Sequence, residues 1–276
     1  MDYFYFLPQI TQITQIYFFK GDMIDIDKIY NEDCLEGMKR IPDGMVDCII
    51  TDLPYGVLNE QSEGGSWDSI IPLEPMWEQF KRVTKPNAAI VLFCQGMFTA
   101  KLMMSQPKMW RYNLIWKKGD RSGGFLNANR MPLRNHEDIA VFYQQLPTYN
   151  PQKRKGSPNH SRGNITSITN RCYGKFDIAE NDLSGMKFPT SIIDYPKEFD
   201  GKQFHPTQKP VDLLRYLILT YTNVGGVVLD ATIGSGTTAV AALMEKRHFI
   251  GFETNKEYFN IAQGRINEVR RNPTLF

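Results

Sequence analysis

Apolar residues follow two alternating patterns along this chain: short continuous runs, and stretches with helical spacing. Continuous runs fit strands buried on both faces of a parallel sheet, and recurrence at every third or fourth position fits amphipathic helices. The runs predict strands at Lys28–Tyr30, Val46–Thr51, Ala88–Cys94, Tyr112–Trp116, Ile139–Tyr143, Val227–Ala231 and Phe249–Phe252. The helical spacing predicts helices at Cys34–Ile41, Pro75–Val83, from Val211 to Tyr221, at Thr237–Glu245 and at Lys256–Val269.

Strands that alternate with helices predict an α/β fold with a doubly wound, mostly parallel sheet. Turn residues at Pro42–Gly44 and Lys85–Asn87 separate the elements. The alternation stops between residues 147 and 200, where Asn, Ser, Gly and Pro are frequent. We therefore expect one main domain made of 23–146 and 201–276, with 147–200 as a small inserted region.

The first 22 residues differ from the rest of the chain. They are rich in aromatic residues and repeat Gln-Ile-Thr, with neither a basic start nor a small-residue cleavage site, so a signal peptide fits poorly. We expect residues 1–22 to be an extension outside the fold and Met23 to be the natural start. Removing the extension should then leave activity intact.

Composition narrows the class of protein. With 42% apolar and 22% charged residues among 276, the chain resembles an ordinary globular protein. Its net charge of +2 does not by itself indicate a nucleic-acid partner. No apolar run approaches the roughly 20 residues that cross a bilayer. The cysteines form no CxxC pair and lie far from histidines, so we expect no metal site, and reduced thiols in a cytoplasmic protein. The cysteines are Cys34, Cys48, Cys94 and Cys172.

A glycine-rich loop, Asp230 to Ala239, joins a predicted strand to a helix. Gly234 and Gly236 let the backbone turn tightly and approach a ligand, and Glu253 ends the next strand, where its carboxylate suits ribose hydroxyls. These are the parts of a nucleoside-cofactor site. The spacing also fits the dinucleotide fingerprint of a nicotinamide-dependent oxidoreductase, although an acid before the loop suits a cationic ligand better than a pyrophosphate.

Asp52-Leu53-Pro54-Tyr55 follows a buried strand directly. An exocyclic amine of a nucleobase is a poor nucleophile, because its lone pair is delocalised into the ring. Two acceptors for its N–H groups, the Asp52 carboxylate and the Leu53 carbonyl, favour rehybridisation of the nitrogen, and Pro54 fixes the turn. Tyr55 offers a flat face for stacking a base extruded from a duplex. A strand-end turn capped by Asp is the structural alternative.

Together these segments resemble the beta class of amino-methyltransferases of DNA. The likeness covers most of 23–146 and 201–270 and includes the opening segment from Asn31 through Thr51 and the segment His205–Pro210 before the glycine loop. The class usually has Asp-Pro-Pro-Tyr where this chain has Leu53, and Asp-Pro-Phe where it has Asp230-Ala231-Thr232. The order of catalytic tetrapeptide, variable region and cofactor loop also matches.

The resemblance implies a Rossmann-like methyltransferase fold, S-adenosylmethionine as cofactor, and a target-recognition role for 147–200. Asp33 would contact the cofactor adenine, and Thr237 and Lys209 the methionine carboxylate. A helix cap at Asp33 and a solvated Lys209 are the structural alternatives. The expected cofactor residues are Asp33, Cys34, Lys209, Asp230, Gly234, Ser235, Gly236, Thr237 and Glu253.

No acidic residue occurs from Ile139 through Phe176, where six basic residues fall in a Gly/Asn/Ser-rich segment. Such a stretch suits phosphate contacts and base readout, although a flexible solvated loop has the same composition. The six are Lys153, Arg154, Lys155, Arg162, Arg171 and Lys175.

A second basic stretch, Lys117–Gly124, with Arg130 and Arg134, is a weaker candidate for the DNA cleft. Trp67 is a candidate for shaping the base pocket.

The sequence thus predicts a site-specific methyltransferase that acts on adenine N6 in duplex DNA by base flipping. N4 methylation of cytosine is the nearest alternative, although the cytosine enzymes more often resemble Ser-Pro-Pro-Tyr, and an NAD-dependent oxidoreductase or a non-enzymatic DNA-binding protein is further away. The resemblance also implies a homodimer and a cognate restriction endonuclease as partners, and no membrane.

Overall fold

The computed structural model describes residues 23–56, 68–120, 122–157, 168–170, 174–176, 185–197 and 208–272. Within them, eight strands form one sheet. In spatial order these are β1 (Lys28–Tyr30), β12 (His248–Phe252), β11 (Val227–Asp230), β2 (Val46–Asp52), β3 (Thr84–Cys94), β5 (His136–Phe142), β4 (Trp110–Lys117) and β10 (Ile192–Asp194). β5 runs antiparallel to its neighbours β3 and β4, and the other neighbouring pairs are parallel.

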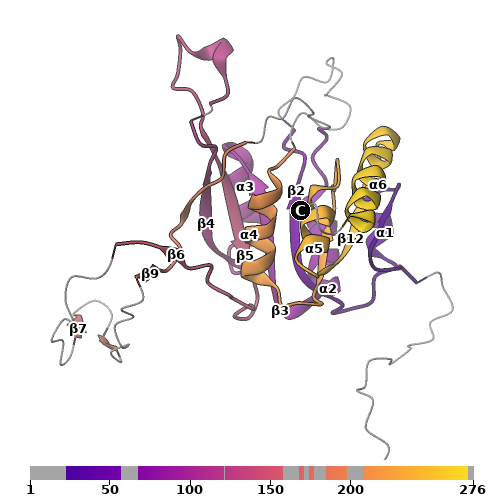
Figure 1. The fold of residues 1–276 in the computed structure, drawn as a ribbon, viewed down its shortest axis with the longest axis horizontal. Coiled ribbons are helices and arrows are strands. Elements are labelled where there is room, and N and C mark those ends of the chain that lie inside the picture. Colours follow the sequence, from indigo (N-terminus) through magenta and orange to yellow (C-terminus); the bar gives the residue numbers. More distant parts are fainter. Residues whose placement is uncertain are drawn as a thin grey trace, which may run out of the picture.

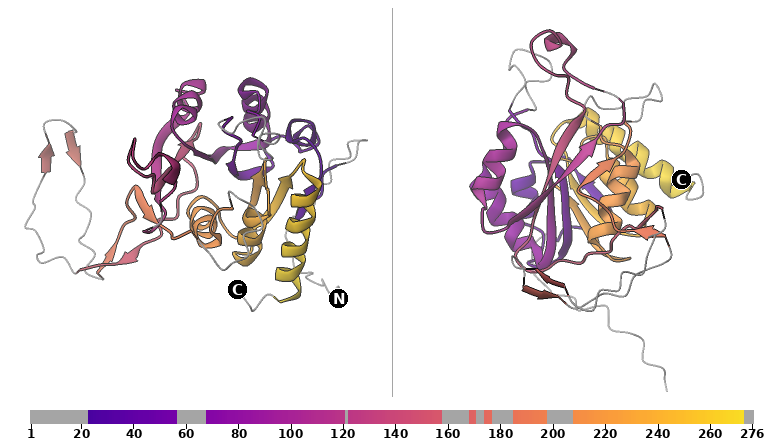
Figure 2. Two further views of the ribbon diagram at one scale, coloured as in Figure 1. Left: turned by 90° about the horizontal axis from the view of Figure 1, so that it is seen from above. Right: turned by 90° about the vertical axis from the view of Figure 1, so that its left-hand side faces the viewer.

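Helices cover both faces of this sheet (Figures 1 and 2). One face carries α1 (Cys34–Met38), α2 (Leu73–Val83) and α3 (Met97–Ser105), and the other carries α4 (Val211–Tyr221), α5 (Thr237–Met244) and α6 (Lys256–Arg271). A short 3₁₀ helix, η1 (Phe125–Asn127), lies between β4 and β5. The predicted doubly wound, mostly parallel α/β fold is therefore confirmed.

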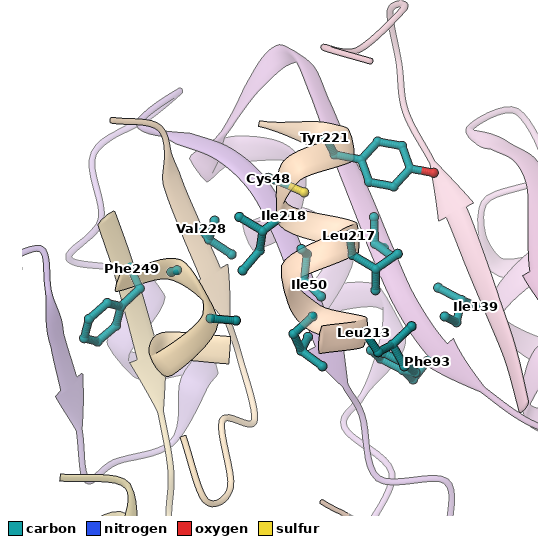
Figure 3. Close-up of a cluster of buried hydrophobic side chains, with 14 of the residues drawn as sticks. Cys48, Ile50, Phe93, Ile139, Leu213, Leu217, Ile218, Tyr221, Val228 and Phe249 are labelled. Atoms are coloured by element: carbon teal, nitrogen blue, oxygen red, sulfur yellow. The ribbon is translucent and has the colours of Figure 1, made fainter. Parts of the chain in front are cut away.

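Each central strand sends alternate side chains into two separate cores, because successive residues of a strand point to opposite faces. In β2, Cys48 and Ile50 pack under α4, whereas Ile49 packs under α1 and α2. Figure 3 shows the α4 side of this arrangement, with Leu217 and Ile218 lying over the sheet. Burial on both faces explains why the central strands appear in the sequence as continuous apolar runs.

A predicted turn and an unpredicted helix are two differences between the elements that the sequence predicts and the structure. The expected turn Lys85–Asn87 lies within β3, where Thr84 pairs with Val46 but Ala89 pairs with Cys48, so these residues bulge out of the ladder. Helix α3 was not predicted, because buried Phe98 and Leu102 and exposed Met97 and Met104 leave it without a polar face to mark its period.

The segment 147–200 contributes to the main sheet through β10, which pairs with β4 at one edge. Its other described strands form two small antiparallel ladders. These are β6 (Arg154–Lys155) with β9 (Met186–Lys187), and β7 (Ile168–Asn170) with β8 (Gly174–Phe176). No helix of the described residues is long and apolar enough to cross a membrane.

Candidate active site

A cavity of about 500 Å³ opens at the carboxyl ends of β2, β11 and β12, the edge at which open α/β sheets bind ligands. The predicted catalytic and cofactor residues, far apart in sequence, meet on its wall. Those that line it are Asp33, Cys34, Asp52, Leu53, Pro54, Tyr55, Lys209, Asp230, Gly234, Ser235, Thr237 and Glu253. Gly236, which supports the wall from behind, completes the predicted set.

The Asp52 carboxylate is the last acidic group of β2 and faces the cavity. The Tyr55 hydroxyl donates a 2.7 Å hydrogen bond to its Oδ1, and the Lys209 ammonium donates to its Oδ2. The sequence assigned Tyr55 only a stacking face. Its hydroxyl therefore adds a second function, which is to orient and polarise the carboxylate.

The turn after Asp52 is held from both sides. The backbone N–H groups of Tyr55 and Gly56 both donate to Asp68 Oδ1, at 2.8 and 3.0 Å. The Leu53 side chain is 3% exposed and packs into the core under α1 and α2. A buried apolar side chain at this position explains how Leu53 replaces the usual proline without loss of the turn.

Thr232 connects the two halves of the site. Its hydroxyl donates to the backbone carbonyl of Asp52 at 2.9 Å and lies 2.8 Å from the Thr51 hydroxyl. The carboxyl end of β2 and the loop after β11 are therefore fastened to each other directly. Thr232 is one of the positions at which the sequence differs from the class that it resembles, and in this structure its hydroxyl joins the two segments.

Four charged side chains form a row along one wall. Lys209 contacts Asp52 on one side and Glu137 Oε2 on the other, at 3.3 Å, and Lys118 pairs with Glu137 Oε1. Glu137 is the second residue of β5, which runs antiparallel in the sheet and so brings this carboxylate to the edge where the parallel strands end. The row contains two cations and two anions, so the charges balance.

Burial and the neighbouring charges together set the pKa values of Lys209, Asp52 and Glu137. Burial alone would lower the pKa of Lys209, but the carboxylates of Asp52 and Glu137 raise it, so the ammonium stays charged. Burial raises the pKa of Asp52 against the opposing attraction of Lys209. For Glu137 the two lysines outweigh burial and lower the pKa.

The glycine loop takes the conformation that its sequence predicts. Gly234 and Gly236 have positive φ values of 53° and 83°. A Cβ on Gly236 would lie 2.8 Å from Cβ of Ala262 in α6, so the loop and helix meet where only glycine fits. Glu253 accepts hydrogen bonds from the N–H groups of Gly234 and Asn255, at 3.0 and 2.7 Å, and its remaining lone pairs can accept from a ligand.

Asp230 shapes the loop from within. Its carboxylate accepts from the Thr232 N–H at 3.1 Å and from the Thr238 hydroxyl at 2.6 Å, and burial raises its pKa to about 6. From outside, Arg265 of α6 donates to the Ser235 carbonyl at 2.7 Å and to the Thr237 hydroxyl at 3.0 Å. Asp230 and Arg265 together hold the loop in one shape.

Asp33 is the N-cap of α1, and its Oδ1 accepts from the N–H groups of Leu35 and Glu36 at 2.8 and 3.3 Å. It also lines the cavity, so capping and a ligand contact are compatible. Cys34 beside it is buried, and burial raises the pKa of its thiol to about 12. A neutral thiol is suited to packing against a ligand and unsuited to nucleophilic chemistry.

The six basic residues proposed for DNA contacts lie apart from this cavity as far as the structure describes them. Arg154 and Lys155 form β6, outside the main sheet on the side of β4, and Lys153 lies 4.6 Å from the Phe188 ring (Figure 1). Lys175 belongs to β8, whose side chains are not described, and Arg162 and Arg171 lie outside the described residues, as do Trp67 and His205–Thr207.

Sequence reasoning missed the contributions of Asp68, Glu137 and Arg265. Asp68 and Arg265 act on backbone groups of segments remote from them, so no local pattern marks them. For Glu137 the sequence does hold a signal: the acidic pair Glu137-Asp138 precedes the buried run Ile139–Phe142. An acid placed beside a continuous apolar strand is expected to have a partner.

Known proteins resemble this chain over most of its length. The profile of the DNA methylase family of N6 and N4 enzymes matches residues 46–264. The type II methyltransferase M.HinfI of Haemophilus influenzae is 27% identical over 90% of this chain and 70% of that relative. The type II methyltransferase M.BglII of Bacillus subtilis is 27% identical over 86% of this chain and 68% of that relative.

Solved structures share the fold. The M1.HpyAVI–SAM complex is 24% identical, with a TM-score of 0.57 over 87% of this chain and 98% of that one. The cytosine-N4-specific PvuII DNA methyltransferase is 14% identical, with a TM-score of 0.62 over 91% of this chain and 93% of that one. Since the family profile spans most of the chain, including both halves of the cavity, this protein belongs to the N6/N4 family of DNA methylases.

Proposed function

We propose that this protein transfers the methyl group of S-adenosylmethionine to the N6 amine of adenine in duplex DNA. The observation that carries the proposal is the cavity in which Asp52 and Tyr55 face the glycine loop and Glu253. Thr232 joins its two halves. A base held at Asp52 and a nucleoside held at Glu253 would therefore share one enclosed space.

The residues present fit the cofactor. Glu253 has acceptor capacity for ribose hydroxyls, and the positive φ of Gly236 keeps the loop close to α6, which leaves room above it. Asp33 adds a second carboxylate on the cavity wall. When bound, S-adenosylmethionine supplies an electrophilic methyl group on a sulfonium, and a cavity rich in carboxylates suits that positive charge.

The chain's own groups act on the target base. Asp52 accepts one N–H of the amine and the Leu53 carbonyl accepts the other, which favours a pyramidal nitrogen with an available lone pair. Tyr55 stacks on the extruded base while its hydroxyl orients Asp52. Holding the nitrogen in line with the methyl group supplies much of the rate. The proton leaves after methylation, to Asp52 or to water.

Adenine is favoured over cytosine by Asp52 itself, because cytosine enzymes of this class more often resemble Ser-Pro-Pro-Tyr. The experiment is to incubate unmethylated DNA with the protein and S-adenosylmethionine, digest the DNA to nucleosides and identify the product by mass spectrometry. The expected product is N6-methyldeoxyadenosine. N4-methyldeoxycytidine would overturn the choice of base, and the absence of any methylated nucleoside would overturn the proposal.

Asp52→Ala is the matched control. It should abolish methyl transfer while S-adenosylmethionine and duplex DNA still bind, because the carboxylate acts on the amine and not on either ligand as a whole. A non-enzymatic DNA-binding protein would instead retain all its function in this variant. Family membership removes the oxidoreductase alternative.

Partners are proposed on the same grounds. Duplex DNA is the substrate, and a homodimer and a cognate restriction endonuclease follow from the resemblance. Light scattering of the purified protein measures whether it is a dimer. Sequencing the methylation pattern of a host that expresses the protein reports base and motif together, and an endonuclease partner should cleave that motif only when it is unmethylated.

A further inference from the structure

Both oxygens of the Asp52 carboxylate are engaged in this structure: Oδ1 by the Tyr55 hydroxyl and Oδ2 by the Lys209 ammonium. The proposed reaction asks the same carboxylate to accept an N–H of a neutral amine. A charge-assisted bond from an ammonium is stronger than a bond from a neutral amine. Lys209 therefore competes with the substrate for Asp52, unless another group takes over its charge.

Glu137 is placed to be that group. Its Oε2 lies 3.3 Å from Lys209 Nζ, which is ion-pair distance, yet it accepts no hydrogen bond within the described residues and is buried from solvent. A buried carboxylate oxygen without a hydrogen bond is costly and calls for an explanation. The ammonium 3.3 Å from this oxygen is the one that donates to Asp52.

The surroundings anchor Glu137 and place the Lys209 ammonium between two carboxylates. Lys118 pairs with Oε1, so the carboxylate is anchored at the start of β5. The Lys209 ammonium lies 5.0 Å from the Phe93 ring centroid and 6.0 Å from that of Trp116, so aromatic faces stabilise the cation between its two partners. The flexible lysine stem needs only a small rotation to exchange one carboxylate for the other.

We infer that Glu137 is a positioning residue: it accepts the Lys209 ammonium when the target base arrives and so frees Asp52 Oδ2 for the amine. The inference rests on the proposed function of Asp52. After the move Glu137 lies between two lysines, and the Asp52 carboxylate is held by the hydrogen bonds from the Tyr55 hydroxyl and from the target amine.

The test is Glu137→Gln, which keeps the shape and removes the charge. Lys209 then has one anionic partner, Asp52, and the single-turnover rate constant of methyl transfer should fall by about tenfold, the size of one charged hydrogen bond. Affinities for S-adenosylmethionine and for duplex DNA should stay within about twofold, because the substitution keeps the shape of the side chain. An unchanged rate constant would overturn the inference.

Lys209→Met supplies the background that separates this role from a structural one. Without the ammonium there is nothing for Glu137 to accept, so Glu137→Gln should cause no further loss in that background. An equal loss in both backgrounds would show that Glu137 acts independently of Lys209 and would contradict the inference. Thermal melting reports whether each variant is folded.

A structure of the wild-type protein tests the inference without any variant. The complex would contain S-adenosylhomocysteine and a duplex with the motif found by methylation sequencing. Lys209 Nζ should then be hydrogen-bonded to Glu137 Oε2, with the target amine on Asp52; Lys209 still on Asp52 Oδ2 beside a bound base would overturn the inference. Failure of the proposed function is distinct, since it would show as a wild-type protein that methylates no DNA.

Discussion

The Tyr55 hydroxyl donates a 2.7 Å hydrogen bond to Oδ1 of Asp52, within the turn that follows β2. In the proposed reaction, one aromatic residue thus offers a ring to the base and a donor to the carboxylate that accepts the amine. The ring itself packs against Phe98 of α3, with centroids 5.2 Å apart. The two functions can be separated by mutation.

Tyr55→Phe keeps the ring and removes the donor. The rate constant of methyl transfer should fall by about tenfold, because the carboxylate loses one charged hydrogen bond. Tyr55→Ala also removes the stacking face, worth roughly 1–3 kcal/mol per base, and should lose at least about tenfold more. Single-turnover assays measure both, and equal rates for the two variants would show that the ring contributes nothing.

Gly236→Ala should weaken cofactor binding. Its φ of 83° is unfavourable for alanine, and the new methyl group would lie 2.8 Å from Cβ of Ala262. We expect a loss of about tenfold or more in S-adenosylmethionine affinity and of about 1–2 kcal/mol in stability. Calorimetric titration and urea unfolding measure these two quantities.

Gly225→Ala is the control for this variant, because Gly225 has a φ of 77° but no atom within 4 Å of the added Cβ. It should cost stability through backbone strain alone and leave cofactor affinity unchanged. If it weakened the cofactor as much as Gly236→Ala, the contact between the loop and α6 would not be the cause.

Asp230 should make stability depend on pH. Its folded-state pKa of about 6 lies above its ordinary value of 3.8, because burial disfavours the anion. The folded state therefore binds the proton more tightly, and the contribution of this group is complete below the ordinary value and is lost as the pH rises through about 6. The loss amounts to about 3 kcal/mol between these limits.

Asp230→Asn isolates this contribution from those of other groups. The variant retains an acceptor for the Thr232 N–H but does not titrate, so wild-type stability should fall relative to it between pH 4 and pH 7. Urea unfolding at several pH values gives the difference. A difference independent of pH would mean that Asp230 has the same pKa in the folded and unfolded states.

A triple alanine variant of Lys153, Arg154 and Lys155 should bind duplex DNA more weakly. If each residue contacts one phosphate, the slope of the logarithm of the association constant against the logarithm of the salt concentration should fall by about 3 in magnitude. Cofactor affinity should not change, since none of the three lines the cavity. Fluorescence anisotropy at several salt concentrations provides both quantities.

The matched control for this variant removes equal charge elsewhere, by changing the exposed Lys81, Lys101 and Lys108 to alanine. Its salt dependence should stay close to that of the wild type. Equal effects of the two triple variants would attribute DNA binding to net charge and leave no specific role for the segment around β6.

The sequence by itself determined the order of the elements and the position of the two ligand loops. Continuous apolar runs mark strands buried on both faces. The carboxyl ends of parallel strands meet at one edge of a sheet, so Asp52 and Glu253, which each end a predicted strand, could be placed at the same edge. The glycines of the loop were predictable for a local reason, since their conformations are ones that other residues avoid.

Only the tertiary structure decided what surrounds these groups. β5 enters the sheet antiparallel, so its first residues carry Glu137 to the catalytic edge, where Lys209 links it to Asp52. Arg265 reaches the glycine loop from the last helix in the same way. Hydrogen bonds and ion pairs act over a few ångströms between segments far apart along the chain, and local patterns of residues carry no record of which distant segments will meet.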